Sequence, residues 1–190
     1  MIIESKPVVR RRLAGARAAL TAAEQAVAGE AIGRAGVALA VGVGAQLVAG
    51  YASVAPEPPT GPLLAALARA GRQVLLPAVR SDGALDWIRY YPGEPLVPGR
   101  FGLPEPVGER FGPEALAKVG LAFVPALGVD RSGRRLGRGG GYIDRALSGG
   151  RPRLVFAVVY DGELLDRVPG GAADQPVDGV LRPAGTERFG

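Results

Sequence analysis

The sequence contains no cysteine and no histidine among its 190 residues. Without cysteine, a disulfide framework, a thiolate nucleophile and a cysteine-based zinc site are all excluded. Without histidine, the chain lacks the usual general base and the commonest metal ligand, and it cannot form a Ser-His-Asp triad. Any chemistry therefore depends on carboxylates, arginine, lysine, tyrosine and backbone groups.

Long apolar runs and lysines are also scarce. No run of about 18 apolar residues occurs without a charge, and residues 1–6 lack the layout of a signal peptide, so we expect a cytoplasmic protein without membrane contact. Only Lys6 and Lys118 are lysines, and the other cations behind the formal charge of +5 are dispersed arginines. Because aromatic residues make up only 6%, no basic and aromatic stripe for stacking bases is present, and a nucleic-acid partner is not expected.

The length and the pattern predict a single α/β domain over residues 1–190. A chain of this size can bury roughly 70% of its unfolded surface, and neither a linker nor an internal repeat divides it. Helices are predicted at residues 5–20, 21–40, 62–70, 114–118 and 142–147, and strands at 46–51, 73–79, 85–90, 119–125, 154–160 and 177–181. This alternation favours a mixed, largely parallel sheet flanked by helices.

Several local signals refine this outline. Ser5 is the expected N-cap of the first helix, and the pattern of Thr21 and Glu24 predicts a capping box for the second. Helical spacing places Lys6, Arg10 and Arg17 on one cationic stripe. Asp82 and Gly83 predict a hairpin turn, whereas residues 92–113 and 128–141 are interpreted as long loops.

The second of these loops carries the strongest chemical signal. Glycines at 137, 139, 140 and 141 let successive backbone N–H groups face one concavity just before a predicted helix, an arrangement that attracts phosphate. Arg135 and Arg138 add forked donors, and Asp144 in the first helical turn can hold Mg²⁺ against nucleotide phosphates. Since the loop fits neither a P-loop nor a dinucleotide fingerprint, it indicates another type of ATP-phosphate site.

The motif itself resembles a known family. The run from Val124 to Asp130, VPALGVD, and the run from Arg135 to Asp144, RLGRGGGYID, resemble the signature of 5-formyltetrahydrofolate cyclo-ligases, also called methenyltetrahydrofolate synthetases. Weaker matches occur in the right order along most of the chain: Lys6-x-x-x-Arg10, Glu57-x-x-Thr60, the strand with Leu76-Pro77, Phe101-Gly-Leu-Pro-Glu-Pro106 and Asp174-x-x-x-Asp178. One departure is Ile143, where the family commonly has an aromatic residue.

The resemblance implies a role for each matching residue. It implies that ATP is bound by Lys6, Arg10, Arg135, Leu136, Gly137, Arg138, Gly139, Gly140, Gly141, Tyr142 and Ile143. The implied Mg²⁺ ligands are Asp144 and Asp174, the implied folate contacts are Ala52, Glu57, Phe101 and Tyr142, and the implied catalytic residues are Arg138 and Lys6.

The implied activity is the ATP- and Mg²⁺-dependent conversion of 5-formyltetrahydrofolate to 5,10-methenyltetrahydrofolate, with release of ADP and phosphate. The expected partners are small molecules, ATP and a reduced folate, and a monomer is expected. The alternative is a non-catalytic protein that binds nucleotide or RNA phosphates through the same Arg/Gly loop. Asp144, Asp174 and Glu57 favour the enzyme, because a simple polyanion binder has no use for carboxylates that face its ligand.

Overall fold

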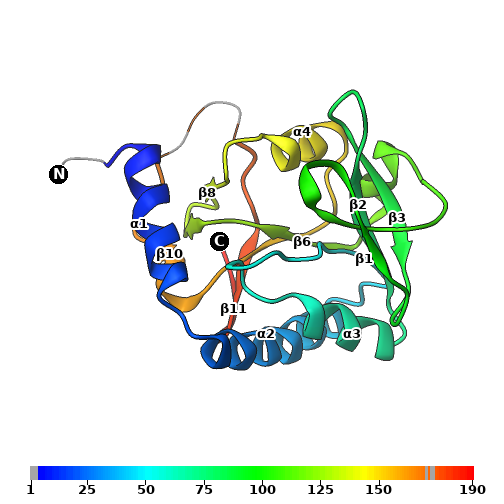
Figure 1. Ribbon diagram of the computed structural model, residues 1–190, viewed down its shortest axis with the longest axis horizontal. Helices are drawn as coiled ribbons and strands as arrows, with labels where there is room; N and C mark the ends of the chain where they lie inside the picture. The colour runs from blue at the N-terminus through cyan, green and yellow to red at the C-terminus, as the bar shows by residue number, and fades with distance from the viewer. Residues whose placement is uncertain (1–3, 170, 172–173) are drawn as a thin grey trace.

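A seven-stranded sheet forms the centre of the computed structural model, which describes residues 4–169, 171 and 174–190. Its strands are β1 (Leu47–Ala49), β2 (Gln73–Val79), β3 (Leu85–Tyr90), β6 (Leu121–Pro125), β9 (Val155–Val158), β11 (Gly179–Arg182) and β12 (Gly185–Arg188). They lie in the order β12-β11-β9-β6-β1-β2-β3 (Figure 1). The five inner strands are parallel, and β3 and β12 pair antiparallel at the edges, which confirms the predicted mixed sheet.

Helices cover both faces of this sheet. Helices α2 (Ala22–Gly42) and α3 (Gly61–Arg69) lie on one face, and α4 (Tyr142–Gly149) lies with the 3-10 helix η2 (Pro113–Lys118) on the other (Figure 1). Successive residues of β6 alternate between the two cores: Phe123 packs with α3, and Val124 packs in the core of α4. The residues of β6 are continuously apolar because a parallel sheet that is covered on both faces has no side in contact with water. The predicted α/β class is therefore confirmed.

Helix α1 (Lys6–Ala18) lies to one side, against a small sheet of β10 (Leu164–Leu165), β7 (Gly128–Asp130) and β8 (Arg135–Leu136) (Figure 1). Its buried face consists of Val9, Leu13 and Arg17 at helical spacing. Arg17 therefore does not share the surface stripe of Lys6 and Arg10 as predicted. Its position on α1 faces the core, and there its guanidinium forms a buried bidentate ion pair with Glu163.

Most element positions are as predicted, with boundary shifts of a few residues. Both predicted long loops contain short hairpins: β4 (Leu96–Pro98) pairs with β5 (Pro104–Pro106), and β7 pairs with β8. In the second hairpin, Asp130 Oδ1 accepts from the backbone of Ser132 and Arg134, and Gly133 supplies a φ of 81° for the turn. The remaining elements are η1 (Arg100–Gly102) and η3 (Asp161–Glu163).

The two predicted helix caps have different outcomes. The capping box at Thr21 and Glu24 is confirmed, with both reciprocal hydrogen bonds present. Ser5 occupies the N-cap position of α1, but its side chain makes no capping hydrogen bond, and Pro7 in the first turn removes one N–H group that would need a partner.

The strand order determines where a ligand can bind. Numbered along the chain, the five parallel strands β1, β2, β6, β9 and β11 are arranged 2-1-3-4-5 across the sheet. The direction of winding reverses between β1 and β6, which leaves a crevice beyond their carboxyl ends. None of the helices in the described ranges is long and apolar enough to cross a bilayer.

Candidate active site

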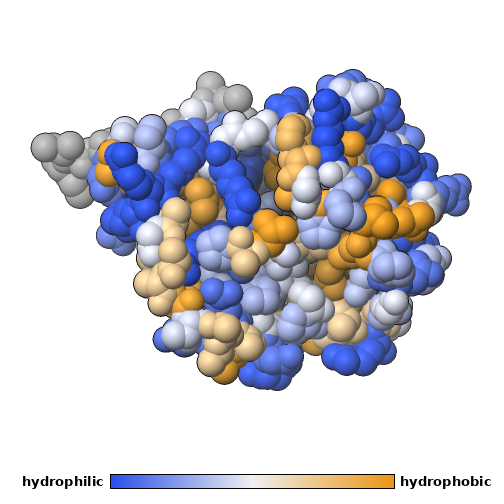
Figure 2. All heavy atoms as spheres, viewed as in Figure 1, coloured by the Kyte–Doolittle hydropathy of each residue, from blue (hydrophilic) through white to orange (hydrophobic). Residues whose placement is uncertain are grey.

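A cavity of about 830 Å³ occupies this crevice. Its floor comes from the residues that follow β1 and β6, and its walls come from the β2–β3 hairpin, the glycine loop and the first turn of α4. Figure 2 shows hydrophilic side chains gathered over α1 and the surface hollowed between this helix and α4. The cavity therefore lies where an open α/β sheet is expected to bind its ligands.

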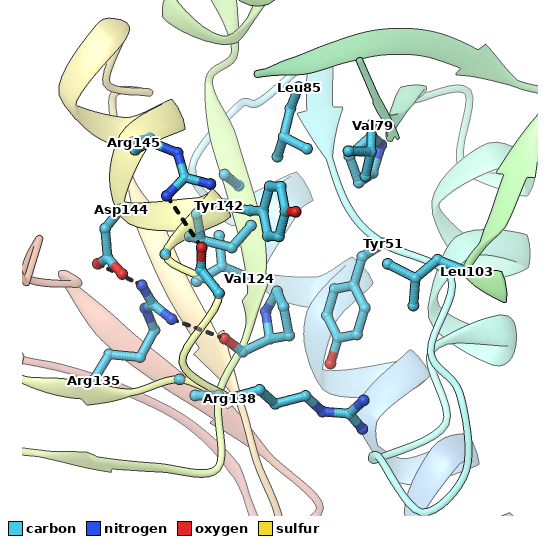
Figure 3. A pocket seen from close by; sticks show the side chains of 18 of the residues that line it. Tyr51, Val79, Leu85, Leu103, Val124, Arg135, Arg138, Tyr142, Asp144 and Arg145 are labelled. Atoms are coloured by element: carbon cyan, nitrogen blue, oxygen red, sulfur yellow. Dashed lines mark hydrogen bonds and ion pairs between the residues drawn. The ribbon is translucent and has the colours of Figure 1, made fainter. Parts of the chain in front are cut away.

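The two sides of the cavity differ in chemistry. Arg135, Asp144 and Arg145 lie together on one side, and Val79 and Leu103 lie on the other, as Figure 3 shows. Tyr142, the first residue of α4, stands between them (Figure 3). One side is therefore suited to a charged ligand group and the other to a flat apolar one.

Three ion pairs connect cations and carboxylates along the cavity. They are Lys6 Nζ with Asp174 Oδ2 at 2.7 Å, Arg135 Nη2 with Asp144 Oδ1 at 2.6 Å, and Arg138 Nη2 with Glu57 Oε1 at 3.2 Å. Burial raises the pKa of Asp174, but hydrogen bonds from Lys6 and from the Gly171 N–H outweigh it, and the pKa is lowered overall. Three of the four cations predicted to bind ATP, namely Lys6, Arg135 and Arg138, are thus held beside a predicted metal or folate ligand.

Asp144 and Asp174 can serve as ligands of a magnesium ion. In the described part of the chain, Oδ2 of Asp144 and Oδ1 of Asp174 accept no hydrogen bond, and no group of three or more acidic, histidine or cysteine side chains forms a metal cage. Mg²⁺ is commonly bound by only one or two carboxylates together with substrate phosphates and water. The two aspartates therefore fit Mg²⁺ that arrives with a nucleotide.

The glycine loop is shaped by backbone conformation. Gly139 and Gly141 have φ values of 110° and 68°, in the region that favours glycine. Arg10 Nε donates to the carbonyl of Gly137 at 2.9 Å and so connects α1 to the loop. The first N–H groups of α4 begin directly after Gly141 and have no partner within the helix. These donors at the cavity edge are suited to bind anionic oxygen atoms.

The loop between β1 and α3 positions Glu57. Thr60 Oγ1 donates to the carbonyl of Tyr51 at 2.6 Å and accepts from the N–H of Ser53, which closes the loop. Within it, Glu57 Oε2 accepts from the N–H of Val54 at 3.0 Å, and the side chain is buried at the cavity wall. The spacing Glu57-x-x-Thr60 therefore has a structural reason: the threonine shapes the loop that presents the glutamate.

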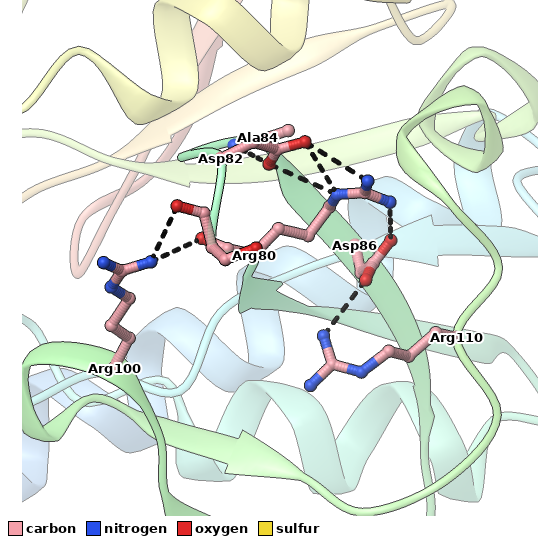
Figure 4. Close-up of polar contacts among 7 residues, drawn as sticks. Arg80, Asp82, Ala84, Asp86, Arg100 and Arg110 are labelled. Carbon is pink, nitrogen blue, oxygen red and sulfur yellow. Dashed lines mark hydrogen bonds and ion pairs between the residues drawn. The ribbon is translucent and has the colours of Figure 1, made fainter.

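Phe101 and Tyr142 face each other at the cavity, with ring centroids 6.0 Å apart. Phe101 is 68% exposed and has a φ of 60°, which is unusual for a residue other than glycine. Its neighbour Arg100 donates through Nη1 to the carbonyls of Arg80 and Ser81, each at 3.0 Å (Figure 4). The loop that carries Phe101 is thereby tied to the β2–β3 hairpin.

Ion pairs stabilise the β2–β3 hairpin. Arg80 lies between Asp82 and Asp86, at 3.2 Å and 3.4 Å, and Asp86 also accepts from Arg110 at 3.0 Å (Figure 4). Asp86 is buried, so its two arginine partners compensate a carboxylate that would otherwise be costly to enclose.

The cavity contains nearly all the residues predicted for the site. Every predicted ATP, folate and magnesium residue lines it except Leu136, whose side chain is 1% exposed and packs with α1. Sequence reasoning missed several lining residues: Tyr51, Trp87, Arg145 and Gln175. Tyr51 could have been found, because it follows β1 at the switch point, the place between β1 and β6 where the direction of winding reverses and where open α/β sheets bind ligands. For Gln175 no sequence signal is evident.

The fold and the cavity define an α/β protein whose binding site has separate charged and apolar sides, and comparison with known proteins identifies its family. The profile of the 5-formyltetrahydrofolate cyclo-ligase family matches residues 2–183. A 5-formyltetrahydrofolate cyclo-ligase of Mycolicibacterium smegmatis is 42% identical over 147 residues, which cover 74% of this chain and 75% of that protein. The Escherichia coli protein of the same name is 33% identical over 144 residues, 74% of this chain and 79% of the relative.

Solved structures give the same assignment. The 5,10-methenyltetrahydrofolate synthetase of Aquifex aeolicus superimposes with a TM-score of 0.78 at 28% identity, over 97% of this chain and 92% of that one. A synthetase from Mycoplasma pneumoniae shares the fold, with a TM-score of 0.73 at 20% identity, over 94% and 98% of the two chains. The chain belongs to the 5-formyltetrahydrofolate cyclo-ligase family and is a ligase. This decides between the two alternatives that the sequence left open, in favour of the enzyme.

Proposed function

We propose that this ligase uses Mg²⁺ and ATP to convert 5-formyltetrahydrofolate to 5,10-methenyltetrahydrofolate, releasing ADP and phosphate. The main support is the division of one cavity into a charged side, with Arg135, Asp144 and Arg145, and an apolar side, with Val79 and Leu103. The glycine loop, Glu57 and the rings of Phe101 and Tyr142 line the same cavity. A triphosphate matches the first side. A flat ring with hydrogen-bond donors on one edge matches the second.

In the proposed reaction, the formyl oxygen attacks the γ-phosphorus of ATP, and the bond from phosphorus to the bridging oxygen breaks to release ADP. The N10 lone pair then attacks the formyl carbon to close the ring. The carbon–oxygen bond breaks, phosphate leaves with that electron pair, and the N10 proton passes to solvent. Catalysis of this kind depends on positioning and on neutralising the charge of the transferred group.

The chain supplies these functions from the cavity walls. Arg138 and Lys6 are proposed to stabilise charge on the transferred phosphoryl group, and Arg10, Arg135 and the loop from Gly137 to Ile143 to hold the nucleotide. Asp144 and Asp174 would hold Mg²⁺, which supplies charge neutralisation at the phosphates when bound.

On the folate side, Glu57 is proposed to accept from the pterin ring N–H and amino groups, a pairing that two carboxylate oxygens suit. Ala52, Phe101 and Tyr142 would pack on the ring. Leu136 would contribute only its backbone, since its side chain is enclosed by the core. That the enzyme acts in the cytoplasm as a monomer, with residues 1–190 forming one functional unit, remains part of the prediction.

The test is to incubate the protein with 5-formyltetrahydrofolate and Mg-ATP and to follow the ultraviolet absorbance of the methenyl product. We expect product only when both ATP and Mg²⁺ are present, with one ADP and one phosphate for each product molecule. Product that forms equally well without ATP, or no product under any condition, would overturn the proposal.

A further inference from the structure

Among the residues that the structure describes, the hydroxyl group of Tyr51 is a buried hydrogen-bond donor without a partner. Tyr51 follows β1 at the switch point of the sheet and lines the cavity, and its side chain is only 7% exposed. Within the described residues, its Oη forms no hydrogen bond. Buried polar groups are nearly always paired, so an unpaired one on the wall of a binding cavity needs an explanation.

Packing does not explain this hydroxyl. A phenylalanine would fill the same space without enclosing an unpaired polar atom, and that exchange is usually neutral or stabilising. Tyr160, which is nearby and also buried, differs in this respect, because its hydroxyl donates to the carbonyl of Glu57 at 3.3 Å. The fold therefore satisfies one tyrosine hydroxyl beside the Glu57 loop and leaves the other unsatisfied.

The surroundings of Tyr51 keep the group protonated. Burial raises the pKa of Tyr51 well above its ordinary value, and the Glu57 carboxylate raises it further. Arg17 and Arg138 act in the opposite direction but do not cancel these effects. At neutral pH the hydroxyl therefore offers a proton to an acceptor and carries no charge.

Arg138 lies near both the Tyr51 hydroxyl and the Glu57 carboxylate. The Tyr51 hydroxyl points toward the Arg138 guanidinium (Figure 3). Arg138 is itself 52% exposed and is held to Glu57 by one contact of 3.2 Å. Because Arg138 is half exposed and makes a single contact with Glu57, its side chain can exchange this partner for a phosphate. The Glu57 carboxylate is buried and keeps the hydrogen bond from the N–H of Val54, so after the exchange it needs a new donor from the ligand. The departure of Arg138 would free the Glu57 carboxylate and leave room for a ligand acceptor beside the Tyr51 hydroxyl.

The two groups then form a matched pair for one edge of a pterin ring. That edge presents an amino group, a ring N–H and a carbonyl oxygen in sequence. Glu57 is suited to accept from the first two, and a neutral donor beside it is suited to the third. We propose that Tyr51 donates a hydrogen bond to the pterin carbonyl oxygen and is a further folate-binding residue. This inference rests on the proposed folate substrate.

Tyr51→Phe tests the inference, because it removes one oxygen atom and keeps the ring. Trp87 is the only tryptophan and lines the same cavity, so its fluorescence can report folate binding without turnover. We expect the dissociation constant and the KM for 5-formyltetrahydrofolate to rise about tenfold, equivalent to about 1.4 kcal/mol, while the KM for ATP changes less than about twofold. The melting temperature should stay the same or rise.

Two control variants separate binding from folding. Tyr90→Phe removes a tyrosine hydroxyl outside the cavity and should leave both substrates' constants unchanged. Tyr160→Phe removes a paired buried hydroxyl and should lower the melting temperature. Unchanged folate binding in Tyr51→Phe would overturn the inference, as would a fall in melting temperature with equal loss of both substrates. Tenfold weaker folate binding by Tyr51→Phe would support the inference even if the enzyme showed no turnover. If the wild type bound no folate, both the proposed function and this inference would be overturned.

Discussion

Asp144 shapes the loop through its hydrogen bonds and is proposed to bind Mg²⁺, and one substitution can separate these two roles. Its Oδ1 accepts from Arg135 at 2.6 Å and from the N–H of Gln175 at 3.1 Å, and its other oxygen faces no partner among the described residues. Asparagine keeps an acceptor oxygen of nearly the same size but removes the negative charge. The substitution therefore preserves the shape of the loop and weakens any bond to a divalent cation.

We predict that Asp144→Asn lowers ATP-dependent turnover more than tenfold and raises the Mg²⁺ concentration needed for half-maximal rate, because hard cations require charged oxygen ligands. The measurement is the initial rate as a function of Mg²⁺ at saturating ATP. Asp161→Asn is the matched control, since Asp161 is exposed and lies outside the cavity. A near-normal rate at limiting Mg²⁺ would exclude Asp144 as a ligand.

At the scale of elements, a buried ion pair connects α1 to η3, next to the carboxyl end of β6. Arg17 donates to Glu163 at 2.6 Å and 2.8 Å and also to the carbonyl of Ala126 at 2.6 Å. Arg131 and Glu187 are also 2.6 Å apart, but they are 64% and 31% exposed, against 2% and 4% for the buried pair. The same distance thus occurs in two different dielectric environments.

We predict that Arg17→Met lowers the free energy of unfolding by about 3–5 kcal/mol, because it leaves the Glu163 carboxylate buried and unpaired. Arg131→Met should hardly change stability, because an exposed pair is screened by water. Chemical denaturation of both variants measures the difference. The prediction is wrong if the two variants lose similar stability. The loss of Arg17 should also raise the KM for ATP, since α1 carries Lys6 and Arg10 into the cavity.

The loop with Phe101 is a second element whose position depends on a few polar contacts. Arg100 connects it to the carbonyls of Arg80 and Ser81, and its guanidinium also lies 5.7 Å from the centre of the Phe101 ring. We predict that Arg100→Ala raises the KM for the folate several-fold and leaves the KM for ATP unchanged, because only the aromatic wall is released. Steady-state kinetics with each substrate varied in turn provides the measurement.

Arg89→Ala is the control for this loop, since Arg89 is an arginine of β3 that donates to Gln73 outside the cavity. If Arg100→Ala altered ATP and folate constants equally, the loop would not belong to the folate side alone.

Sequence reasoning predicted elements that are stabilised locally or by long apolar runs. The strand at β6, the capping box of α2 and the turn at Gly83 have their signals within a few residues. The β7–β8 hairpin was missed because its strands are only three and two residues long, and it depends on contacts with Asp130 and packing against α1. Short strands of this kind carry too little periodicity to be recognised.

The site shows the same limit for pairs of residues that are distant in sequence. The spacing of the glycines and arginines placed them in one loop, and that loop lines the cavity, but Asp174 lies 168 residues from its partner Lys6. Similarly, Glu163 lies 146 residues from Arg17, and no pattern near Arg17 distinguishes it from the cations of the cavity. Contacts of this range arise from the sheet topology, which the local spacing of residues does not reveal.

At the scale of the whole molecule, the Glu57–Arg138 pair connects the two halves of the cavity. Glu57 belongs to the loop after β1, and Arg138 belongs to the glycine loop before α4. Without ligands each neutralises the other, so neither is free for its proposed substrate. In the proposed function, a nucleotide that draws Arg138 to its phosphates would release Glu57 for the folate, and by linkage the folate would favour the nucleotide equally.

We predict that a non-hydrolysable Mg-ATP analogue lowers the dissociation constant of 5-formyltetrahydrofolate several-fold, a coupling of about 1 kcal/mol. Arg138→Ala should bind the folate tightly without the analogue, gain nothing from its addition, and turn over more than tenfold more slowly, because the charge at the phosphoryl group is missing. Trp87 fluorescence titrations with and without the analogue measure the coupling, and Arg131→Ala, outside the cavity, should behave as wild type. If folate affinity in the wild type were indifferent to the analogue, or if Arg138→Ala kept the full coupling, the ion pair would not connect the two substrates.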